Sequence, residues 1–195
     1  SIRFPLFTLY SDSLYRLIDK CVGESNNLYA EQIFRETAEV FAKDTTLTDS
    51  LEHLDTSYTN LLMISSDLYK RIFGIDNFTL SDGSGLSRMN FFSADKFVKV
   101  LTTMFEDNNF ISYVSSFPRP GTNGTLESKM MHPDLQGRLF AKTGSMTGVN
   151  ALSGYLYTKK NRRIAFSVIN NYYDLSRNRT NASFEDILLY FVNNY

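Results

Sequence analysis

Three short apolar segments near the C-terminus limit the folds that this chain can adopt. Residues 138–143, 149–157 and 163–170 have the patterning of β-strands, and the last two are joined by the short polar link Lys159-Lys160-Asn161. Parallel strands need a crossover connection of a dozen or more residues, so strands with links this short pair antiparallel. The sequence therefore predicts a three-stranded antiparallel meander whose apolar faces need a covering of helices.

Helical patterns occur on both sides of that meander. Apolar residues recur at helical spacing within residues 11–43, where residues 23–27 interrupt the pattern, and in residues 57–73, 94–106, 108–116 and 184–192. We expect Gly74 to end the helix before it, and Asn181 or Ser183 to cap the last helix. Residues 78–90, rich in Ser, Gly and Asp, predict a loop. The predicted fold class is α+β, an antiparallel sheet covered by helices.

Composition narrows the class of protein further. The chain has 195 residues, 43% of them hydrophobic, which suits one domain or most of one. Twenty basic residues against 21 acidic ones give a net charge of −1, which argues against a nucleic-acid partner bound by bulk charge.

No apolar run is long enough for a transmembrane segment. Cys21 is the single cysteine, so no internal disulfide can form. The first residues lack the pattern of a signal peptide, and we expect the chain to be a piece of a longer protein.

The strongest chemical motif is Lys142-Thr143-Gly144-Ser145, at the end of the first predicted strand. A lysine there supplies positive charge for a substrate carboxylate, and the two hydroxyls add donors. The glycine lets a substrate backbone approach closely, and an edge strand can pair with an extended peptide. Lys-Thr-Gly is also a signature of penicillin-binding proteins and class A β-lactamases. The alternative is an ordinary lysine at a strand end followed by a turn.

A second candidate is Ser25-Asn26-Asn27, in the connection between the first two predicted helices. A serine hydroxyl can relay a proton, and an asparagine amide can hold a substrate carbonyl. By itself the triplet is a weak signal, because such residues often cap a helix.

Both motifs belong to a set of four blocks that resembles peptidase family S13, the D-Ala-D-Ala carboxypeptidases of the penicillin-binding protein 4 (DacB) type. The blocks occur in the family's order and with plausible spacing. They are residues 24–32, residues 82–88 with Asn90, residues 121–126, and residues 141–145 followed by 148–149 and 152–155. The resemblance covers nearly the whole chain and implies a β-lactamase/transpeptidase-like fold.

The resemblance also implies an activity and a location. Enzymes of this family act in the bacterial cell envelope, in the periplasm or another extracytoplasmic place. They cleave peptidoglycan stem peptides that end in D-Ala-D-Ala, as carboxypeptidases or endopeptidases, through an acylated serine. β-Lactams inhibit them by acylating the same serine, and no cofactor or metal is expected.

By the same likeness, individual residues take roles. Ser25 is the expected proton relay, and Asn27 is a substrate-contacting amide. Lys142 is the catalytic lysine of the third motif, and Thr143 contacts the substrate carboxylate. Gly144 keeps the strand accessible, and the backbone N–H of Ser145 is one of two oxyanion donors. For residues 82–88 we expect a structural turn fixed by Asp82.

The family's nucleophile motif, Ser-x-x-Lys, has no counterpart before Ser25. The one such spacing, Ser93-Ala94-Asp95-Lys96, follows Ser25 and opens a predicted helix, which favours Ser93 as an ordinary N-cap. We therefore expect residues 1–195 to be the C-terminal portion of a transpeptidase-like domain that is incomplete on its N-terminal side, without the nucleophile or the family's inserted domains.

This interpretation predicts that the chain alone is inactive and self-associates through surface that the missing part would cover. Two alternatives stay open. One is a non-catalytic module that binds peptidoglycan peptides or β-lactams, and the other is a serine β-lactamase.

Overall fold

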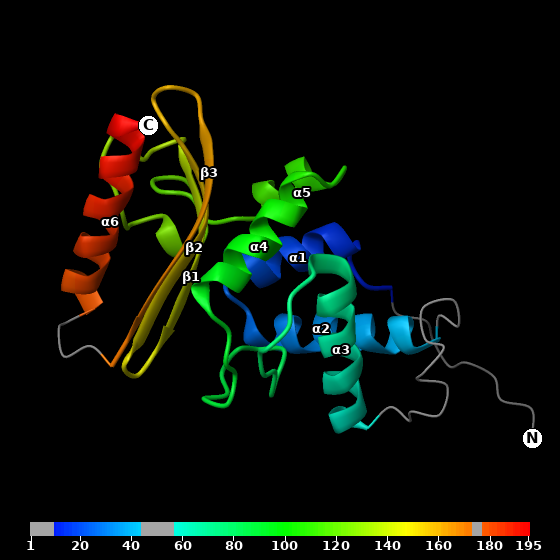
Figure 1. Cartoon of the computed structure of the whole chain (residues 1–195). Coiled ribbons are helices and arrows are strands. Elements are labelled where there is room, and N and C mark those ends of the chain that lie inside the picture. Colours follow the sequence, from blue (N-terminus) through cyan, green and yellow to red (C-terminus); the bar gives the residue numbers. More distant parts are fainter. Residues whose placement is uncertain (1–9, 44–56, 173–176) are drawn as a thin grey trace, which may run out of the picture.

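The computed structural model describes residues 10–43, 57–172 and 177–195. Within these ranges five helices and a short 3₁₀ turn precede the strands, and one helix follows them; Figure 1 shows their arrangement. In chain order these elements are α1 (Leu14–Gly23), α2 (Asn27–Lys43), α3 (Tyr58–Phe73), α4 (Ala94–Phe105), α5 (Phe110–Ser115), η1 (Gly124–Leu126), β1 (Leu139–Met146), β2 (Val149–Tyr157), β3 (Arg163–Asn171) and α6 (Arg177–Asn194).

The three strands form the predicted antiparallel meander, in the order β1-β2-β3. Lys142 lies opposite Ser153, which in turn lies opposite Ser167, so these three residues form one row across the sheet. Helix α6 lies along one face of the sheet, and α4 lies on the other (Figure 1). The α+β class with an antiparallel sheet covered by helices is confirmed.

Each face of the sheet has its own apolar core. Toward α6 the strands bury alternate side chains against α6 and the segment before β1; this cluster comprises Leu126, Met130, Leu135, Leu139, Ala141, Leu152, Leu156, Phe184, Leu188 and Val192. On the other face Tyr155 is fully buried among Leu101, Phe110, Val114 and Phe117. The hydroxyl of Tyr155 donates to the carbonyl oxygen of Leu101 at 2.7 Å, so this core leaves that polar group satisfied.

The ends of β1 and α6 differ from the predictions by several residues. β1 continues to Met146 rather than ending at residue 143, because Gly144, Ser145 and Met146 still pair with β2 and the turn is only Thr147-Gly148. The motif at Lys142 therefore lies inside the edge strand. Helix α6 begins at Arg177, so the predicted caps at Asn181 and Ser183 are wrong.

Both wrongly predicted caps lie within α6 and make other hydrogen bonds. Asn181 accepts a hydrogen bond from the side chain of Asn150 at 2.9 Å, and the Ser183 hydroxyl donates to the carbonyl oxygen of Arg179. By contrast, Gly74 ends α3 in the left-handed conformation, at φ 63°, as predicted.

Candidate active site

The candidate site begins at the open edge of β1. Backbone groups of successive strand residues point alternately to the two neighbouring positions. The N–H of Ala141 donates to the carbonyl oxygen of Pro118, on the side away from β2, at 3.1 Å. Thr143 and Ser145 share this direction, and in the described sheet no strand lies beyond β1. The edge at Thr143 and Ser145 can therefore accept an extended peptide.

Lys142 joins this edge to the helices. Its Nζ donates to the Ser25 hydroxyl at 2.7 Å and to the carbonyl oxygen of Thr143 at 2.7 Å. Lys142 and Ser25 are 117 residues apart in the sequence. Burial lowers the pKa of Lys142, the nearby thiol of Cys21 acts in the opposite direction, and the charge of Lys129 lowers it further. The structure thus brings together the two residues predicted to be catalytic, and burial makes the Lys142 ammonium easier to deprotonate than that of an exposed lysine.

Cys21 lies on α1 and is half-buried rather than fully buried. Burial raises the pKa of its thiol, and the charge of Lys142 partly offsets that effect. A raised pKa keeps the thiol neutral, and the neutral thiol is a poor nucleophile.

The junction between α1 and α2 places Ser25 at Lys142. Ser25 adopts a left-handed conformation with φ 59°, which is uncommon for a residue with a side chain. The following N–H, that of Asn26, donates to the carbonyl oxygen of Cys21 and closes the turn. The Asn26 side chain then accepts the N–H of Tyr29 at 3.2 Å, which caps α2. Asn26 caps α2, and this leaves the Ser25 hydroxyl available to Lys142.

The remaining predicted site residues are exposed or half-buried. Asn27 is the first residue of α2 and is exposed, and so is Ser145 on β1. A Cβ atom on Gly144 would lie 3.4 Å from the Cβ of Ala151, which is an ordinary contact. Sheet packing therefore does not require glycine at this position. Because glycine has no side chain, nothing projects from the surface of the strand beside Lys142.

A further residue, Thr125 of η1, was not singled out by the sequence. Its hydroxyl accepts a hydrogen bond from the Thr143 hydroxyl at 2.8 Å. Gly124, at φ 66°, packs against the carbonyl oxygen of Gly23, where a Cβ would come within 2.5 Å. The segment before β1 therefore contacts both the strand and the α1–α2 junction. Residues 121–126 were part of the family resemblance, and that was the signal available in the sequence.

The loop at residues 81–90 is organised by Asp82, as predicted. Its carboxylate accepts the N–H groups of Gly85 at 2.6 Å and Ser87 at 2.7 Å, and the Asn90 side chain at 3.0 Å. Burial raises the pKa of Asp82, but these hydrogen bonds outweigh that effect and hold the pKa below its usual value. Arg88 of the same loop donates to the carbonyl oxygen of Thr147, so the loop supports the turn at the end of β1.

Replacing Asp82 with alanine is expected to destabilise the protein by about 2 kcal/mol at pH 7, because three donors lose a charged acceptor at a partly exposed place. A carboxyl group with a lowered pKa stabilises the fold above its unfolded-state pKa, and the contribution disappears as the pH falls through the folded-state value. The difference from wild type should therefore shrink below the ordinary value of 3.8. Urea unfolding of wild type and variant at pH 7 measures the loss of stability, and the same comparison at pH 3 shows whether the difference shrinks.

The exposed Asp76, replaced by alanine, is the matched control and should change stability by less than about 0.5 kcal/mol. Equal stability of the Asp82 and Asp76 variants at pH 7 would show that Asp82 does not hold the loop.

The pair at Ser93 and Lys96 forms a local contact. Lys96 Nζ donates to the Ser93 hydroxyl at 3.2 Å at the start of α4. Ser93 occupies the N-cap position, as predicted, but its side chain makes no capping hydrogen bond. Helix α4 packs mainly on β3, at the opposite edge of the sheet from Lys142. In the described residues Lys142 donates to Ser25 and Thr143, and Ser93 is not among these partners.

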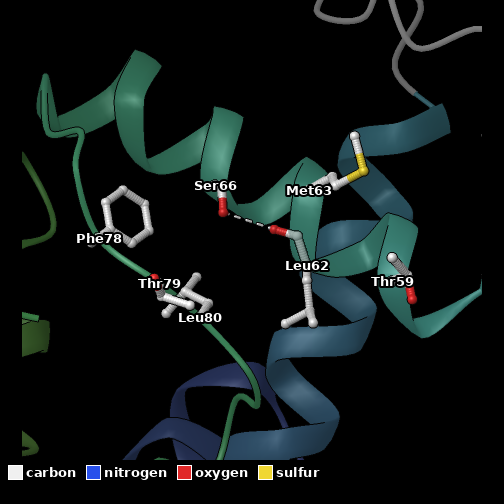
Figure 2. A pocket seen from close by; sticks show the side chains of 7 residues that line it. All are labelled: Thr59, Leu62, Met63, Ser66, Phe78, Thr79 and Leu80. Carbon is white, nitrogen blue, oxygen red and sulfur yellow. Dashed lines mark hydrogen bonds between the residues drawn. The ribbon is translucent and has the colours of Figure 1, made fainter. Parts of the chain in front are cut away.

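One hollow in the described surface lies away from these residues. A cavity of about 440 Å³ lies between α3 and residues 78–80 (Figure 2). Its lining is mainly apolar, and its Ser66 hydroxyl already donates to the carbonyl oxygen of Leu62. None of the predicted site residues lines it, so the presence of a cavity does not by itself identify the candidate site.

Within the described ranges no three metal-ligating side chains cluster, and no helix there is long and apolar enough to span a bilayer.

The helix-covered meander and the lysine–serine pair at its edge define a protein of the β-lactamase/transpeptidase-like fold. Comparison with protein families gives the assignment: residues 3–188 match the D-Ala-D-Ala carboxypeptidase 3 (S13) family, and the chain belongs to that family.

Two relatives illustrate the family at the level of sequence. The penicillin-sensitive carboxypeptidase A of Dictyostelium discoideum is 31% identical over 179 residues, which are 86% of this chain and 32% of that protein. The D-alanyl-D-alanine carboxypeptidase DacB of Haemophilus influenzae is 29% identical over 165 residues, 83% of this chain and 33% of that protein. The chain thus spans about a third of the length of these relatives.

Solved structures agree with the fold. Penicillin-binding protein 4 (dacB) of Haemophilus influenzae, in complex with a β-lactam, superimposes with a TM-score of 0.77 at 26% identity, covering 92% of this chain and 41% of that one. A class A β-lactamase representative from Bacteroides cellulosilyticus gives a TM-score of 0.64 at 14% identity, covering 94% and 65% of the two chains. The second likeness concerns the fold alone.

Proposed function

We propose that the protein containing this chain is a serine-type D-Ala-D-Ala carboxypeptidase or endopeptidase that cleaves peptidoglycan peptides through an acyl-enzyme. The observation that carries the proposal is the 2.7 Å contact between Lys142 Nζ and the Ser25 hydroxyl beside the open edge of β1. Membership of the S13 family supports the reaction class. The extracytoplasmic cell envelope, where the family's substrate lies, is the proposed location.

In this proposal the substrate lies along β1 as an added strand. The N–H of Ser145 points out of the open edge and stabilises the oxyanion of the tetrahedral intermediate. The Thr143 hydroxyl and the ammonium group of Lys142 bind the C-terminal carboxylate of the substrate. The exposed amide of Asn27 holds a substrate carbonyl. Gly144 lets the peptide approach the strand.

Ser25 and Lys142 move the proton. A serine nucleophile attacks the peptide carbonyl, and its proton passes through the Ser25 hydroxyl to the departing D-Ala amine. Because burial lowers the pKa of Lys142, its amine can exchange a proton with the Ser25 hydroxyl more readily than an exposed lysine could. Water then releases the acyl group by the reverse path.

The nucleophile is proposed to lie in a Ser-x-x-Lys segment outside residues 1–195. The one such spacing in this chain, Ser93 with Lys96, is at the start of α4, which packs on β3. Residues 1–195 would then be the C-terminal portion of a transpeptidase-like domain. The chain's share of about a third of its relatives' length supports this.

Fluorescent penicillin labelling tests the proposal. The full-length protein is expected to become labelled and to release D-Ala from a pentapeptide, whereas residues 1–195 alone are expected to do neither. Unlabelled, inactive full-length protein would contradict the enzymatic proposal. Label on residues 1–195 that disappears in the S93A variant would contradict the placement of the nucleophile.

Residues 1–195 alone also test the expected self-association. The outer edge of β3 has no strand beside it in the described sheet, and a cavity of about 300 Å³ adjoins it, lined mainly by apolar side chains of β2, β3, α4 and α6. Unpaired edges of this kind promote association. Residues 1–195 alone should therefore form dimers or larger species in light scattering. A monodisperse monomer would contradict this part of the proposal.

The full-length experiment also separates the alternatives. A non-catalytic module would bind the peptide or the β-lactam without releasing D-Ala. A β-lactamase would hydrolyse the β-lactam rapidly, without a lasting acyl-enzyme. No contact in the described residues favours either alternative over the carboxypeptidase.

A further inference from the structure

Thr125 is placed to control the hydroxyl of Thr143. The two hydroxyl oxygens lie 2.8 Å apart, and Thr143 is the donor. Both side chains are half-buried, Thr143 on the edge strand and Thr125 on η1. Each hydroxyl has one proton to donate and two lone pairs to accept. In this arrangement the single proton of Thr143 is already used by Thr125.

A carboxylate changes that arrangement, because it only accepts hydrogen bonds. Thr143 can donate to a carboxylate only if its proton turns away from Thr125. The Thr125 hydroxyl can then rotate and donate to the freed lone pair of Thr143. A chain of hydroxyls that ends on a charge is polarised along its length, so the donor next to the carboxylate becomes stronger.

We propose that Thr125 is a positioning residue for recognition of the substrate's C-terminal carboxylate, acting through the hydroxyl of Thr143. The inference rests on the proposed function, in which Thr143 binds that carboxylate. Thr125 holds the Thr143 side chain in one rotamer and returns a hydrogen bond to it when the carboxylate arrives.

The surrounding contacts make a purely structural role for the Thr125 hydroxyl unnecessary. The backbone bond from Ala141 to Pro118 ties this segment to β1. Gly124 packs against the carbonyl oxygen of Gly23, which ties the segment to the α1–α2 junction. Leu126, fully buried in the core toward α6, anchors η1. These contacts involve the backbone or apolar atoms, so they persist when the hydroxyl of Thr125 is removed.

The test compares Thr125→Val and Thr125→Ser with wild type in the full-length protein, with steady-state D-Ala release from a pentapeptide as the assay. Valine keeps the shape and removes the hydroxyl, and serine keeps the hydroxyl. For Thr125→Val we expect KM to rise about 10-fold with kcat within about twofold, as for one lost hydrogen bond in a charged network. Thr125→Ser should stay within about threefold of wild type, and the melting temperatures of both should match wild type.

Thr102→Val is the matched control, since the Thr102 hydroxyl is exposed on α4 and donates only to carbonyl oxygens of its own helix. A KM within twofold of wild type for Thr125→Val would overturn the inference. So would an equal defect in Thr125→Ser, or a loss of kcat that follows a lowered melting temperature. Inactive wild-type protein would overturn the proposed function and this inference together, whereas an active wild type with a normal Thr125→Val variant overturns only the inference.

Discussion

Replacement of Lys142 by methionine is expected to reduce D-Ala release by the full-length protein about 10³-fold or more, within the range for loss of a positioned proton-transfer group. Lys142 Nζ contacts both the Ser25 hydroxyl and the carbonyl oxygen of Thr143, so the variant loses the proton path and a positive charge near the substrate carboxylate. Steady-state kinetics with a pentapeptide and the rate of penicillin acylation measure the effect.

We expect the Lys142→Met variant to lose activity while it stays folded. Burial lowers the pKa of Lys142, which means that keeping its amine charged destabilises the folded state. Methionine has a similar length and no charge, so the substitution removes this destabilisation. The unfolded state binds more protons than the folded state at pH values just below the ordinary lysine pKa of 10.5, so wild-type stability should rise with pH there. In the methionine variant this contribution to the pH dependence should be absent from urea unfolding curves.

Lys99→Met is the control for loss of a lysine charge, because Lys99 is exposed on α4. Its activity should stay within about twofold of wild type, as for an ordinary surface substitution. More than a tenth of wild-type activity in the Lys142→Met variant would remove Lys142 from the mechanism.

Replacement of Gly154 by alanine is expected to be the most destabilising single methyl addition, by about 4 kcal/mol or more. A Cβ on Gly154 would lie 2.1 Å from the carbonyl oxygen of Phe140 and 2.6 Å from the Cα of Ala141. Both atoms belong to the backbone of β1, and they cannot move without breaking the ladder that joins β1 to β2. Urea or thermal unfolding of the full-length protein gives the magnitude.

Gly137→Ala separates this clash from the conformational freedom of glycine. Gly137 has φ 69°, but a Cβ added there would have no neighbouring atom within 4 Å, so its alanine variant should lose only about 1 kcal/mol. If the Gly154 and Gly137 variants were equally stable, the close packing of β1 on β2 would not be the cause.

The sequence determined the local parts of this protein. Short links between apolar strands forced the antiparallel meander, since no crossover fits between them. Gly74 ended α3 because glycine tolerates the left-handed conformation. The lysine of β1 and the serine before α2 could both be named from motif and resemblance, because their residue types occur in recognisable local strings.

The two boundaries that the sequence predicted wrongly have different causes. β1 continues to Met146 because β2 supplies partners for Gly144 and Ser145, which the polar composition of that stretch did not reveal. Helix α6 starts at Arg177, two turns or so before its apolar pattern begins, since its first residues are polar and leave no periodic signal.

Only the tertiary structure decided which residues meet. Ser25 and Lys142 are 117 residues apart, and their contact depends on how the α1–α2 junction packs beside β1. The pairing of Thr125 with Thr143 likewise depends on the way η1 is anchored by its glycine contact and buried leucine. Periodicity reports which face of an element is buried, but it carries no information about which two faces come together. That choice is made by the packing of the two cores on either side of the sheet.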